Sequence, residues 1–411
     1  METDKTKQKE LKKEEKEYRR HKRIWWFCRH FVGPFIMNKY GCKCTVTEKL
    51  PEPFLLVANH STDLDPGIIG MCSRQQMYFV ASEHLYRLGF LSKILIWAFK
   101  PIAKMKGSSD TLTVMKAIRY LRNGKNVSLF PDGNRSFNGR NGALTDAIGK
   151  LVKTSGANLV TFRITGGFFT NPRWGYGLRK GKMTAQVVNV YSKEQIKEMS
   201  AGQIREIIEK DTYENAYERQ ASVNIRYKGK NRAVGMECSL CICPKCKGIE
   251  TIYTKENSVN CVNCGKLTDY SEYGYFDEGF DFKTIEEWDD WQEQYFKDYI
   301  QILKDGKGSE GVGTEKPVFS NSDINMNIVK TDHSETDLGK GSLSIYLDKI
   351  VIKTNVQTIE IPFTELPDMS VYAKTGLVFS DAAGTHYELK TDKLINVRKY
   401  IYVWSSLRQK E

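Results

Sequence analysis

The sequence has no long hydrophobic run. Its longest stretches without Asp, Glu, Lys or Arg are ten residues, at 53–62 and 183–192, whereas a bilayer-spanning helix needs about 20 mostly apolar residues. We also expect no signal peptide, because the first 23 residues mix acids with bases and Arg29 and His30 interrupt the apolar run that follows. The sequence therefore predicts a cytoplasmic protein without a conventional transmembrane span.

The ten cysteines lack the spacing of a secreted disulfide framework. Six of them lie within residues 238–264, and the other four are scattered at Cys28, Cys42, Cys44 and Cys72. In a large chain, such spacing is typical of metal binding in a reducing compartment.

Acidic residues are scarce in one segment. The 411-residue chain carries a net charge of +12, and residues 100–182 contain sixteen basic but only three acidic residues. This segment alone therefore carries +13, and the rest of the chain carries −1. Such a segment favours an anionic partner: nucleic acid, an acidic membrane surface or a phosphorylated substrate. Apolar residues make up 40% of the chain, which is enough for packed cores in two or three domains.

Apolar runs in residues 51–191 alternate between strand-like and helix-like patterns. Strands are predicted at 54–58, 77–81, 126–130, 159–164 and 185–190, and helices at 85–99 and 110–122. Strands that alternate with helices predict an α/β layer fold, with helices around a mixed sheet.

Residues 1–40 combine a basic stretch with many aromatics. Lys16–Arg23 contains five bases and one acid, and Trp25, Trp26 and Phe27 follow directly. A basic collar beside aromatic side chains is typical of a segment that lies in a membrane interface. The alternative is a terminal helix that docks its aromatics on the protein core. We expect peripheral association with a membrane surface.

Two polar motifs follow predicted strands. His60 and Asp65 come after the strand at 54–58, and Asp65-Pro66 resembles a helix start with Asp65 at the N-cap. The turn allows Asp65 to fold back onto one imidazole nitrogen of His60, which leaves the other nitrogen as a base. Taken alone, this motif favours the simpler interpretation, in which Asp65 caps the helix and His60 is a polar loop residue.

The second motif is Phe-Pro-Asp-Gly-Asn-Arg-Ser at residues 130–136. Gly133 allows close backbone approach, Arg135 supplies a planar guanidinium that binds phosphate with two hydrogen bonds, and Ser136 adds a hydroxyl. Taken alone, the same residues are also typical of a surface turn.

Together and in this order, the two motifs resemble those of the glycerolipid acyltransferases, especially the bacterial 1-acyl-glycerol-3-phosphate acyltransferases. The family's His-x4-Asp motif is matched by His60 and Asp65, and its Phe-Pro-Glu-Gly-Thr-Arg-Ser block is matched except at Asp132 and Asn134, which replace Glu and Thr. The nearest counterpart of the family's Arg-bearing block between them is residues 101–106, which have lysines, Lys104 and Lys106, where Arg is expected. The resemblance covers residues 57–191, and the two departures leave the acceptor open.

The resemblance implies a mechanism and a set of substrates. His60 takes the hydroxyl proton of a lysophospholipid such as lysophosphatidate while its oxygen attacks an acyl thioester, carried on coenzyme A or acyl carrier protein. Asp65 orients His60. The acceptor phosphate is expected to bind Gly133, Arg135 and Ser136, with Lys104 and Lys106 as weaker candidates. The apolar helix at 88–99 would line an acyl groove or a membrane-facing rim, or would pack in the core.

A second cluster has the spacing of a metal site. Cys243 and Cys246 form one CxxC pair and, after fourteen intervening residues, Cys261 and Cys264 form another. Two such pairs predict a tetrahedral thiolate site for structural Zn²⁺ in a small four-cysteine zinc ribbon, since four thiolates leave no open position for catalysis. A redox dithiol pair is the alternative, and the nearby Cys238 and Cys241 would allow ligand exchange.

The C-terminal part changes to short alternating segments. From residue 342 these predict six or seven strands, closed by an amphipathic helix at 394–408 that carries Trp404. The pattern resembles a PH/GRAM-like β-barrel with a closing helix. We therefore predict five regions, which are a membrane-interface segment (1–40), an acyltransferase domain (41–235), a zinc ribbon (236–270), an acidic helix and linker (271–317) and a PH/GRAM-like domain (318–411).

Two other functions compete with a membrane-associated acyltransferase. One is a catalytically inactive lipid-binding scaffold, and the other is a zinc-ribbon nucleic-acid-binding protein. In the ribbon region, Lys245, Lys247, Lys255 and Lys266 are balanced by Glu237, Glu250, Glu256 and Asp269. Nucleic-acid binding requires a basic face, so we expect no nucleic-acid partner.

Overall fold

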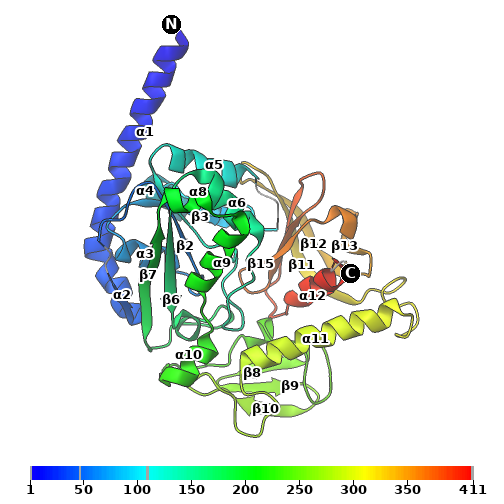
Figure 1. The fold of residues 1–411 in the computed structure, drawn as a ribbon. Coiled ribbons are helices and arrows are strands. Elements are labelled where there is room, and N and C mark those ends of the chain that lie inside the picture. Colours follow the sequence, from blue (N-terminus) through cyan, green and yellow to red (C-terminus); the bar gives the residue numbers. More distant parts are fainter. Residues whose placement is uncertain (1, 46–47, 108–110, 409–411) are drawn as a thin grey trace.

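The computed structural model describes residues 2–45, 48–107 and 111–408 (Figure 1). Residue 1 of the predicted N-terminal segment lies outside the described residues. So do residues 46–47 and 108–110 of the predicted acyltransferase region, which include the start of the helix predicted at 110–122, and residues 409–411 of the C-terminal region.

The first sheet is mixed, as predicted. It has seven strands in the order β1-β7-β6-β2-β5-β3-β4, and every neighbouring pair is parallel except β6 and β7. The strands are β1 (Cys42–Cys44), β2 (Phe54–Ala58), β3 (Met77–Ser82), β4 (Ile102–Lys104), β5 (Asn126–Leu129), β6 (Asn158–Thr165) and β7 (Met183–Tyr191).

Helices cover both faces of this sheet, which explains why β2 is apolar throughout. Leu55 and Val57 join a core on one face, whereas Phe54, Leu56 and Ala58 join the core on the other. The helices of this region are α3 (Asp65–Cys72), α4 (Phe90–Phe99), α5 (Thr111–Arg122), α6 (Asp146–Ser155), α7 (Gly167–Thr170), α8 (Lys193–Glu198), α9 (Ala201–Thr212) and α10 (Ala216–Val223).

The helix predicted at 85–99 is divided. A 3-10 turn spans Glu83–Arg87, and α4 begins only at Phe90. Gly89 lies between them with a φ of +62°, a backbone conformation that glycine adopts without strain.

The N-terminal segment is helical and only partly packed on the sheet. It comprises α1 (Glu2–Phe27), a π-helical turn (Cys28–Val32) and α2 (Gly33–Tyr40), and α1 extends past the rest of the molecule (Figure 1). Trp25 is buried in the core and stacks on Phe79, whereas Phe31 and Phe35 are 62% and 68% exposed. Within the described ranges, no helix combines the length and the apolar character needed to span a bilayer.

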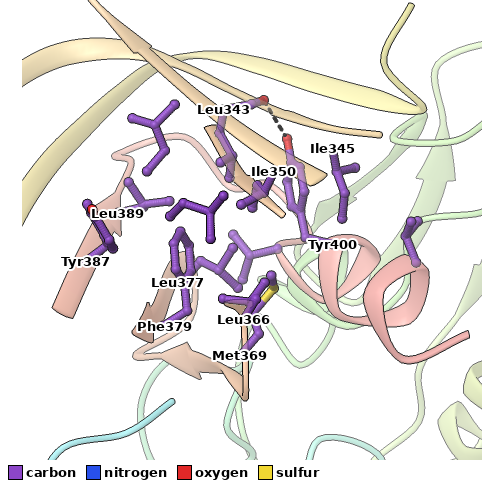
Figure 2. Close-up of a cluster of buried hydrophobic side chains, with 14 of the residues drawn as sticks. Leu343, Ile345, Ile350, Leu366, Met369, Leu377, Phe379, Tyr387, Leu389 and Tyr400 are labelled. Carbon is purple, nitrogen blue, oxygen red and sulfur yellow. Dashed lines mark hydrogen bonds between the residues drawn. The ribbon is translucent and has the colours of Figure 1, made fainter. Parts of the chain in front are cut away.

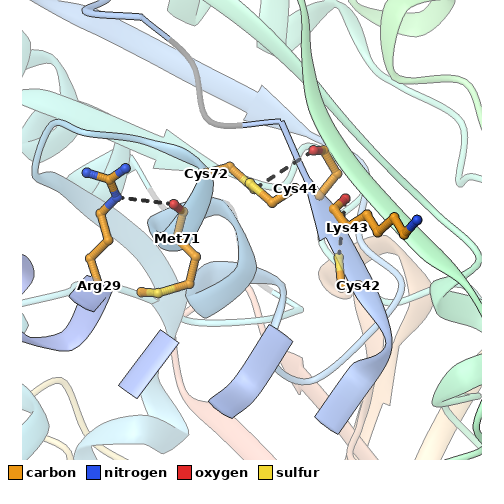
Figure 3. The surroundings of a disulfide bond; sticks show 7 residues. Arg29, Cys42, Lys43, Cys44, Met71 and Cys72 are labelled. Carbon is orange, nitrogen blue, oxygen red and sulfur yellow. Dashed lines mark hydrogen bonds between the residues drawn. A yellow bond between two sulfur atoms is a disulfide. The ribbon is translucent and has the colours of Figure 1, made fainter. Parts of the chain in front are cut away.

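One disulfide bond, which the cysteine pattern did not predict, lies beside this segment. Cys44 at the end of β1 is bonded to Cys72 at the end of α3 (Figure 3). The π-helical turn contacts the same helix, because Nε of Arg29 donates to the carbonyl of Met71 at 3.3 Å. The bond therefore links an edge strand to the helix that begins at Asp65.

The cysteine-rich region forms a small sheet beside a long helix. Its strands β8 (Ile252–Lys255), β9 (Ser258–Cys261) and β10 (Gly265–Asp269) are antiparallel. The acidic helix α11 (Ile285–Lys304) packs on this region through Trp288, whose indole N–H donates to the carbonyl of Ile242 at 3.0 Å. Asp289 on α11 accepts two hydrogen bonds of 2.9 Å from Arg398 of α12 (Arg398–Arg408), so α11 connects the ribbon region to the C-terminal region.

The C-terminal region is a seven-stranded antiparallel sheet, and the prediction of a closed barrel is wrong. The order is β14-β13-β12-β11-β17-β16-β15, and the outer strands β14 and β15 do not pair within the part of the chain that the structure describes. A 3-10 turn at Phe363–Glu365 separates them, and α12 covers the open side. The strands are β11 (Phe319–Val329), β12 (Glu335–Ile345), β13 (Lys349–Thr354), β14 (Thr358–Pro362), β15 (Met369–Tyr372), β16 (Gly376–Ser380) and β17 (His386–Lys390).

The core of this sheet includes the helix α12. Tyr400 is buried among the strand side chains, and its hydroxyl donates to the carbonyl of Leu343 at 3.2 Å (Figure 2). The helix predicted at 394–408 begins later, at Arg398, where the side chain of Asn396 accepts a hydrogen bond from the Arg398 backbone N–H at 2.9 Å.

A buried ionic cluster joins this sheet to the first one. Arg87 forms ion pairs with Glu83, at 2.8 Å, and with Glu388 on β17. His84 contacts Glu388 as well, and its ring stacks on Tyr372 of β15 with centroids 3.5 Å apart. Glu83, His84 and Glu388 have the composition of a metal site, but Arg87 already supplies the compensating positive charge. Breaking such a buried pair is costly, so the cluster fixes the two sheets relative to each other.

Candidate active site

His60 and Asp65 form a hydrogen-bonded pair at the carboxyl end of β2. Nδ1 of His60 lies 2.8 Å from Oδ2 of Asp65. Because a carboxylate accepts, this contact places the imidazole proton on Nδ1 and leaves the Nε2 lone pair free. The His60 ring also stacks on Phe130, with centroids 4.2 Å apart. This tautomer is the one that a general base at Nε2 requires.

Asp65 is fully buried and is held by its own turn. Oδ2 accepts the backbone N–H groups of Ser61 and Thr62 at 2.6 and 2.9 Å, and Oδ1 accepts the Thr62 hydroxyl at 2.5 Å. The sequence predicted Asp65 at the N-cap, but Leu64 occupies that position and Asp65 is the first residue of α3. The turn still folds the carboxylate back onto His60, and these hydrogen bonds fix its orientation.

The environment of His60 favours its neutral form. Burial lowers the pKa of His60 below its usual 6.5, and the positive charges of Arg135 and Lys106 act in the same direction, whereas the hydrogen bond to Asp65 opposes them. Burial has the largest effect on the pKa. It lowers the pKa because the charged imidazolium loses its hydration when it is buried. The imidazole is therefore ready to accept a proton at neutral pH.

The second motif lies directly beside the first, because β5 is the parallel neighbour of β2. The carboxyl ends of parallel strands meet at one edge of a sheet, where ligands bind in α/β folds. The Ser136 backbone N–H donates to the carbonyl of His60 at 3.2 Å. Gly133 has a φ of +67° in the turn, and a Cβ atom at this position would lie 3.9 Å from Nζ of Lys104, so the turn faces the Lys104 segment.

The side chains of Arg135 and Ser136 have different surroundings. Arg135 forms an ion pair with the exposed Asp63 and donates from Nη2 to the carbonyl of Asn171 at 2.9 Å. The hydroxyl of Ser136 donates to the Arg140 carbonyl at 2.7 Å and accepts the Gly139 N–H at 2.8 Å. The Ser136 hydroxyl is thus engaged within its own loop, whereas Arg135 faces the shared cavity.

A cavity of about 830 Å³ brings these residues together. His60, Lys104, Lys106, Gly133 and Arg135 all line it. Its other part is apolar, where strands β3 and β5 meet helices α5 and α6. The apolar lining includes Val80, Val114, Ala117, Leu129, Ile148 and Leu151. The cavity therefore combines one polar, cationic end with an apolar groove.

Sequence reasoning missed two cations of this cavity. Arg173 and Lys374 also line it, but neither lies in a recognisable motif, and Lys374 comes from the C-terminal sheet. Burial and the neighbouring cations Arg135 and Arg398 lower the pKa of Arg173 to about 9. Burial and then the positive charges of Arg173, Lys104 and Arg135 lower the pKa of Lys106 to about 7. Both shifts reflect burial first and the neighbouring positive charges second.

The two departures from the family motif occupy special environments. Burial raises the pKa of Asp132 to about 7. Oδ1 of Asn134 accepts hydrogen bonds from Nζ of Lys106 and from Nη1 of Arg173, both at 3.0 Å. The only sequence signal for the role of Asn134 was the departure itself.

The four predicted zinc ligands lie together. The sulfur atoms of Cys243, Cys246, Cys261 and Cys264 are within 4.8 Å of one another. The Cys243–Cys264 and Cys246–Cys261 sulfur separations are 3.9 and 3.7 Å. Tetrahedral Zn–S bonds of about 2.3 Å would place the sulfurs about 3.8 Å apart, so this cluster fits a Zn²⁺ ion.

The other CxxC pair of the region is part of the core. Cys238 is fully buried, and Cys241 contacts Oε1 of Gln292 at 3.8 Å. Neither belongs to the four-sulfur cluster.

Comparison with known proteins gives a family match and a structural similarity. Residues 41–165 match the acyltransferase family model, so the chain contains an acyltransferase-family domain. Among solved structures, the chain is similar to the 1-acyl-sn-glycerophosphate (LPA) acyltransferase PlsC from Thermotoga maritima, with 18% identity and a TM-score of 0.37 over 45% of this chain and 78% of that one. No curated protein matches the sequence.

Proposed function

We propose that this protein transfers a fatty acyl group from an acyl thioester to the free hydroxyl of lysophosphatidate or a related lysophospholipid, giving phosphatidate in phospholipid biosynthesis. The observation that carries the proposal is the His60–Asp65 pair, which opens onto a cavity with a cationic end and an apolar groove. A lysophospholipid has the same two parts, a phosphate and an acyl chain. Acyl-CoA and acyl carrier protein are both suitable donors.

The residues support a direct transfer without an acyl-enzyme. Nε2 of His60 takes the proton of the acceptor hydroxyl as its oxygen bonds to the thioester carbonyl carbon. The carbon–sulfur bond then breaks, and the imidazolium returns the proton to the leaving thiolate. Asp65 stabilises the imidazolium in between, as a buried carboxylate hydrogen-bonded to Nδ1. General-base assistance of this kind contributes about 10²- to 10⁴-fold.

The test is an acyl-transfer assay on the full chain. Purified protein is incubated with lysophosphatidate and a labelled acyl thioester, and the lipid product is identified. We expect labelled phosphatidate. A protein that binds the lipid but transfers no acyl group from either donor is instead the inactive scaffold.

Arg135→Ala is expected to weaken use of the acceptor. Arg135 is the motif cation that faces the cavity, and its loss also leaves Asp63 without its ion-pair partner. Because charge-assisted hydrogen bonds to phosphate are strong, the apparent KM for lysophosphatidate should rise about ten-fold or more. Steady-state kinetics measure this, with Arg122→Ala, an exposed arginine on α5, as the control. An unchanged dependence on acceptor concentration contradicts the phosphate role.

The exposed aromatics support peripheral membrane binding. Trp26, Phe31 and Phe35 project from the N-terminal helices, and Phe90 and Trp97 from α4, each more than half exposed. The Arg20 guanidinium lies 5.1 Å from the Trp97 ring centroid, so basic and aromatic side chains form one surface across α1 and α4. This exposed face favours the membrane-facing rim for the helix predicted at 88–99, since the apolar cavity wall is built from α5 and α6.

Replacing Trp26, Phe31 and Phe35 by serine is expected to release the protein from anionic phospholipid vesicles. Three aromatic side chains at about 1–2 kcal/mol each make the partition coefficient roughly 100-fold or more smaller. Buried Trp25 is left in place, so the fold is retained. Vesicle sedimentation measures the change, and Val262→Ser/Val356→Ser, two exposed apolar residues elsewhere, is the control. Equal sedimentation of both variants argues against this surface.

The cysteine cluster supports a structural Zn²⁺ held by Cys243, Cys246, Cys261 and Cys264. Such an ion would fix the ribbon on which α11 packs through Trp288. The PH/GRAM-like assignment of residues 318–411 stays a prediction, and so do the five region boundaries and the absence of a nucleic-acid partner.

A further inference from the structure

The C-terminal sheet reaches into the cavity that contains His60. The end of β15 and the turn that follows it place Tyr372, Ala373 and Lys374 in the cavity wall. Nζ of Lys374 donates to the carbonyl of Gly175 and lies 3.3 Å from the ring centroid of Tyr176. Both of these residues line the same cavity, so this part of the sheet is a wall of the site.

The same sheet contacts both segments that carry the predicted phosphate ligands. On β16, the Ser380 N–H donates to the carbonyl of Gly107 at 3.0 Å, directly after Lys106. A Cβ atom at residue 107 would lie 2.5 Å from the carbonyl oxygen of Val378, so glycine permits this close approach. On β15, the hydroxyl of Ser370 accepts from Nδ2 of Asn134 at 2.9 Å.

Asn134 is the centre of this contact. Its Oδ1 accepts from Lys106 and Arg173, while its Nδ2 donates to Ser370. The threonine of the family motif has a single hydroxyl, which is too short to form this set of bonds. Arg173 is also held by the sheet, because Nη2 donates to the carbonyl of Val371 at 3.0 Å and Nε to that of Ala373 at 3.3 Å.

The residues that line the cavity carry a strongly positive net charge. Five cations line the cavity, namely Lys104, Lys106, Arg135, Arg173 and Lys374. Among the described lining residues the only acid is Asp63, which is 65% exposed and already paired with Arg135. Buried positive charge without compensating negative charge is costly, and a phosphate dianion is the kind of ligand that compensates it.

We infer that the C-terminal sheet completes the acceptor site. Lys374 contacts the phosphate of a phosphomonoester acceptor directly, and Asn134, braced by Ser370, is a positioning residue for Lys106 and Arg173. The inference rests on the proposed acyl transfer and adds to it that headgroup selection depends on residues outside the acyltransferase-family domain. A phosphate of the thioester carrier has the same chemistry, so the experiment separates acceptor from donor.

Lys374→Ala in the full chain tests the direct contact. We expect the KM for lysophosphatidate to rise about ten-fold or more while kcat and the KM for acyl-CoA stay within about two-fold, since one charge-assisted hydrogen bond is lost. Lys374→Arg should recover part of the affinity, and Lys353→Ala, an exposed lysine on β13, should change nothing. Asn134→Thr should raise the acceptor KM in the same way, without loss of thermal stability beyond that of Lys353→Ala.

A second experiment measures binding and does not depend on turnover. Calorimetry with sn-glycerol 3-phosphate, the acceptor headgroup alone, should show binding to the wild type and about ten-fold weaker binding to Lys374→Ala. Equal affinities, or a rise confined to the KM for acyl-CoA, overturn the inference while leaving the proposed function intact. A wild type that binds the headgroup but transfers no acyl group overturns the proposed function alone, and one that does neither overturns both.

Discussion

His60→Ala is expected to lower kcat for phosphatidate formation by about 10²- to 10⁴-fold, the range that a positioned general base contributes. The His60 imidazole is the group with a free nitrogen at the cavity and a buried carboxylate behind it. Because the phosphate contacts remain, the KM for lysophosphatidate should change little. Steady-state kinetics with lysophosphatidate and acyl-CoA measure both quantities.

The matched control is His30→Ala, which removes an exposed histidine from the N-terminal segment and should retain full activity in mixed micelles. The pH profile gives an independent check. Because the pKa of His60 lies below 6.5, its neutral, basic form predominates at neutral pH, and on the acid side kcat/KM should fall as the pH drops below 6.5. Wild-type rates in His60→Ala would remove the mechanism.

Zinc removal is the second change with a large expected effect. The double variant Cys243→Ser/Cys246→Ser should reduce the zinc content from one ion per chain to none, as measured by elemental analysis of purified protein. Structural zinc sites stabilise small folds by about 10 kcal/mol or more in isolated peptides. The loss should therefore unfold the ribbon, with a lower first transition in calorimetry.

Unfolding of the ribbon should also affect the acceptor loop. On α11, Asp289 accepts a hydrogen bond from Asn138 at 3.0 Å, and Asp290 pairs with Arg140 at 2.6 Å, both just after the second motif. We therefore expect a higher acceptor KM in the zinc-free variant. Cys28→Ser, outside the cluster, is the control and should retain its zinc. Metal-free wild type with unchanged stability would contradict the structural role.

The sequence was sufficient to predict the parts of the site that lie in one strand and its following turn. Alternating apolar runs predicted a mixed α/β sheet, and β2 and β5 lead directly into the His60 and Arg135 motifs. Parallel pairing then brings the two motifs together. The four cysteines were predictable for the same reason, since each CxxC pair is a local turn.

The remaining features depend on contacts between distant parts of the chain. Lys374 reaches the cavity only because β15 packs beside the second motif, although Ser370 and Asn134 are 236 residues apart in sequence. The Cys44–Cys72 bond likewise requires β1 and α3 to be adjacent. The open C-terminal sheet was missed because strand alternation predicts which residues face the core, whereas closure depends on whether the two outer strands meet.

The close contact between Gly107 and β16 determines which fragments of this protein keep the site intact. The family match ends at residue 165, yet residue 107 lies against the backbone of β16. A fragment excised at the family boundary would lack β7, Arg173 and the whole surface that covers the lysine segment. Its sheet would end at an unpaired β6, a template for aggregation. A fragment meant to keep this contact therefore has to include β16.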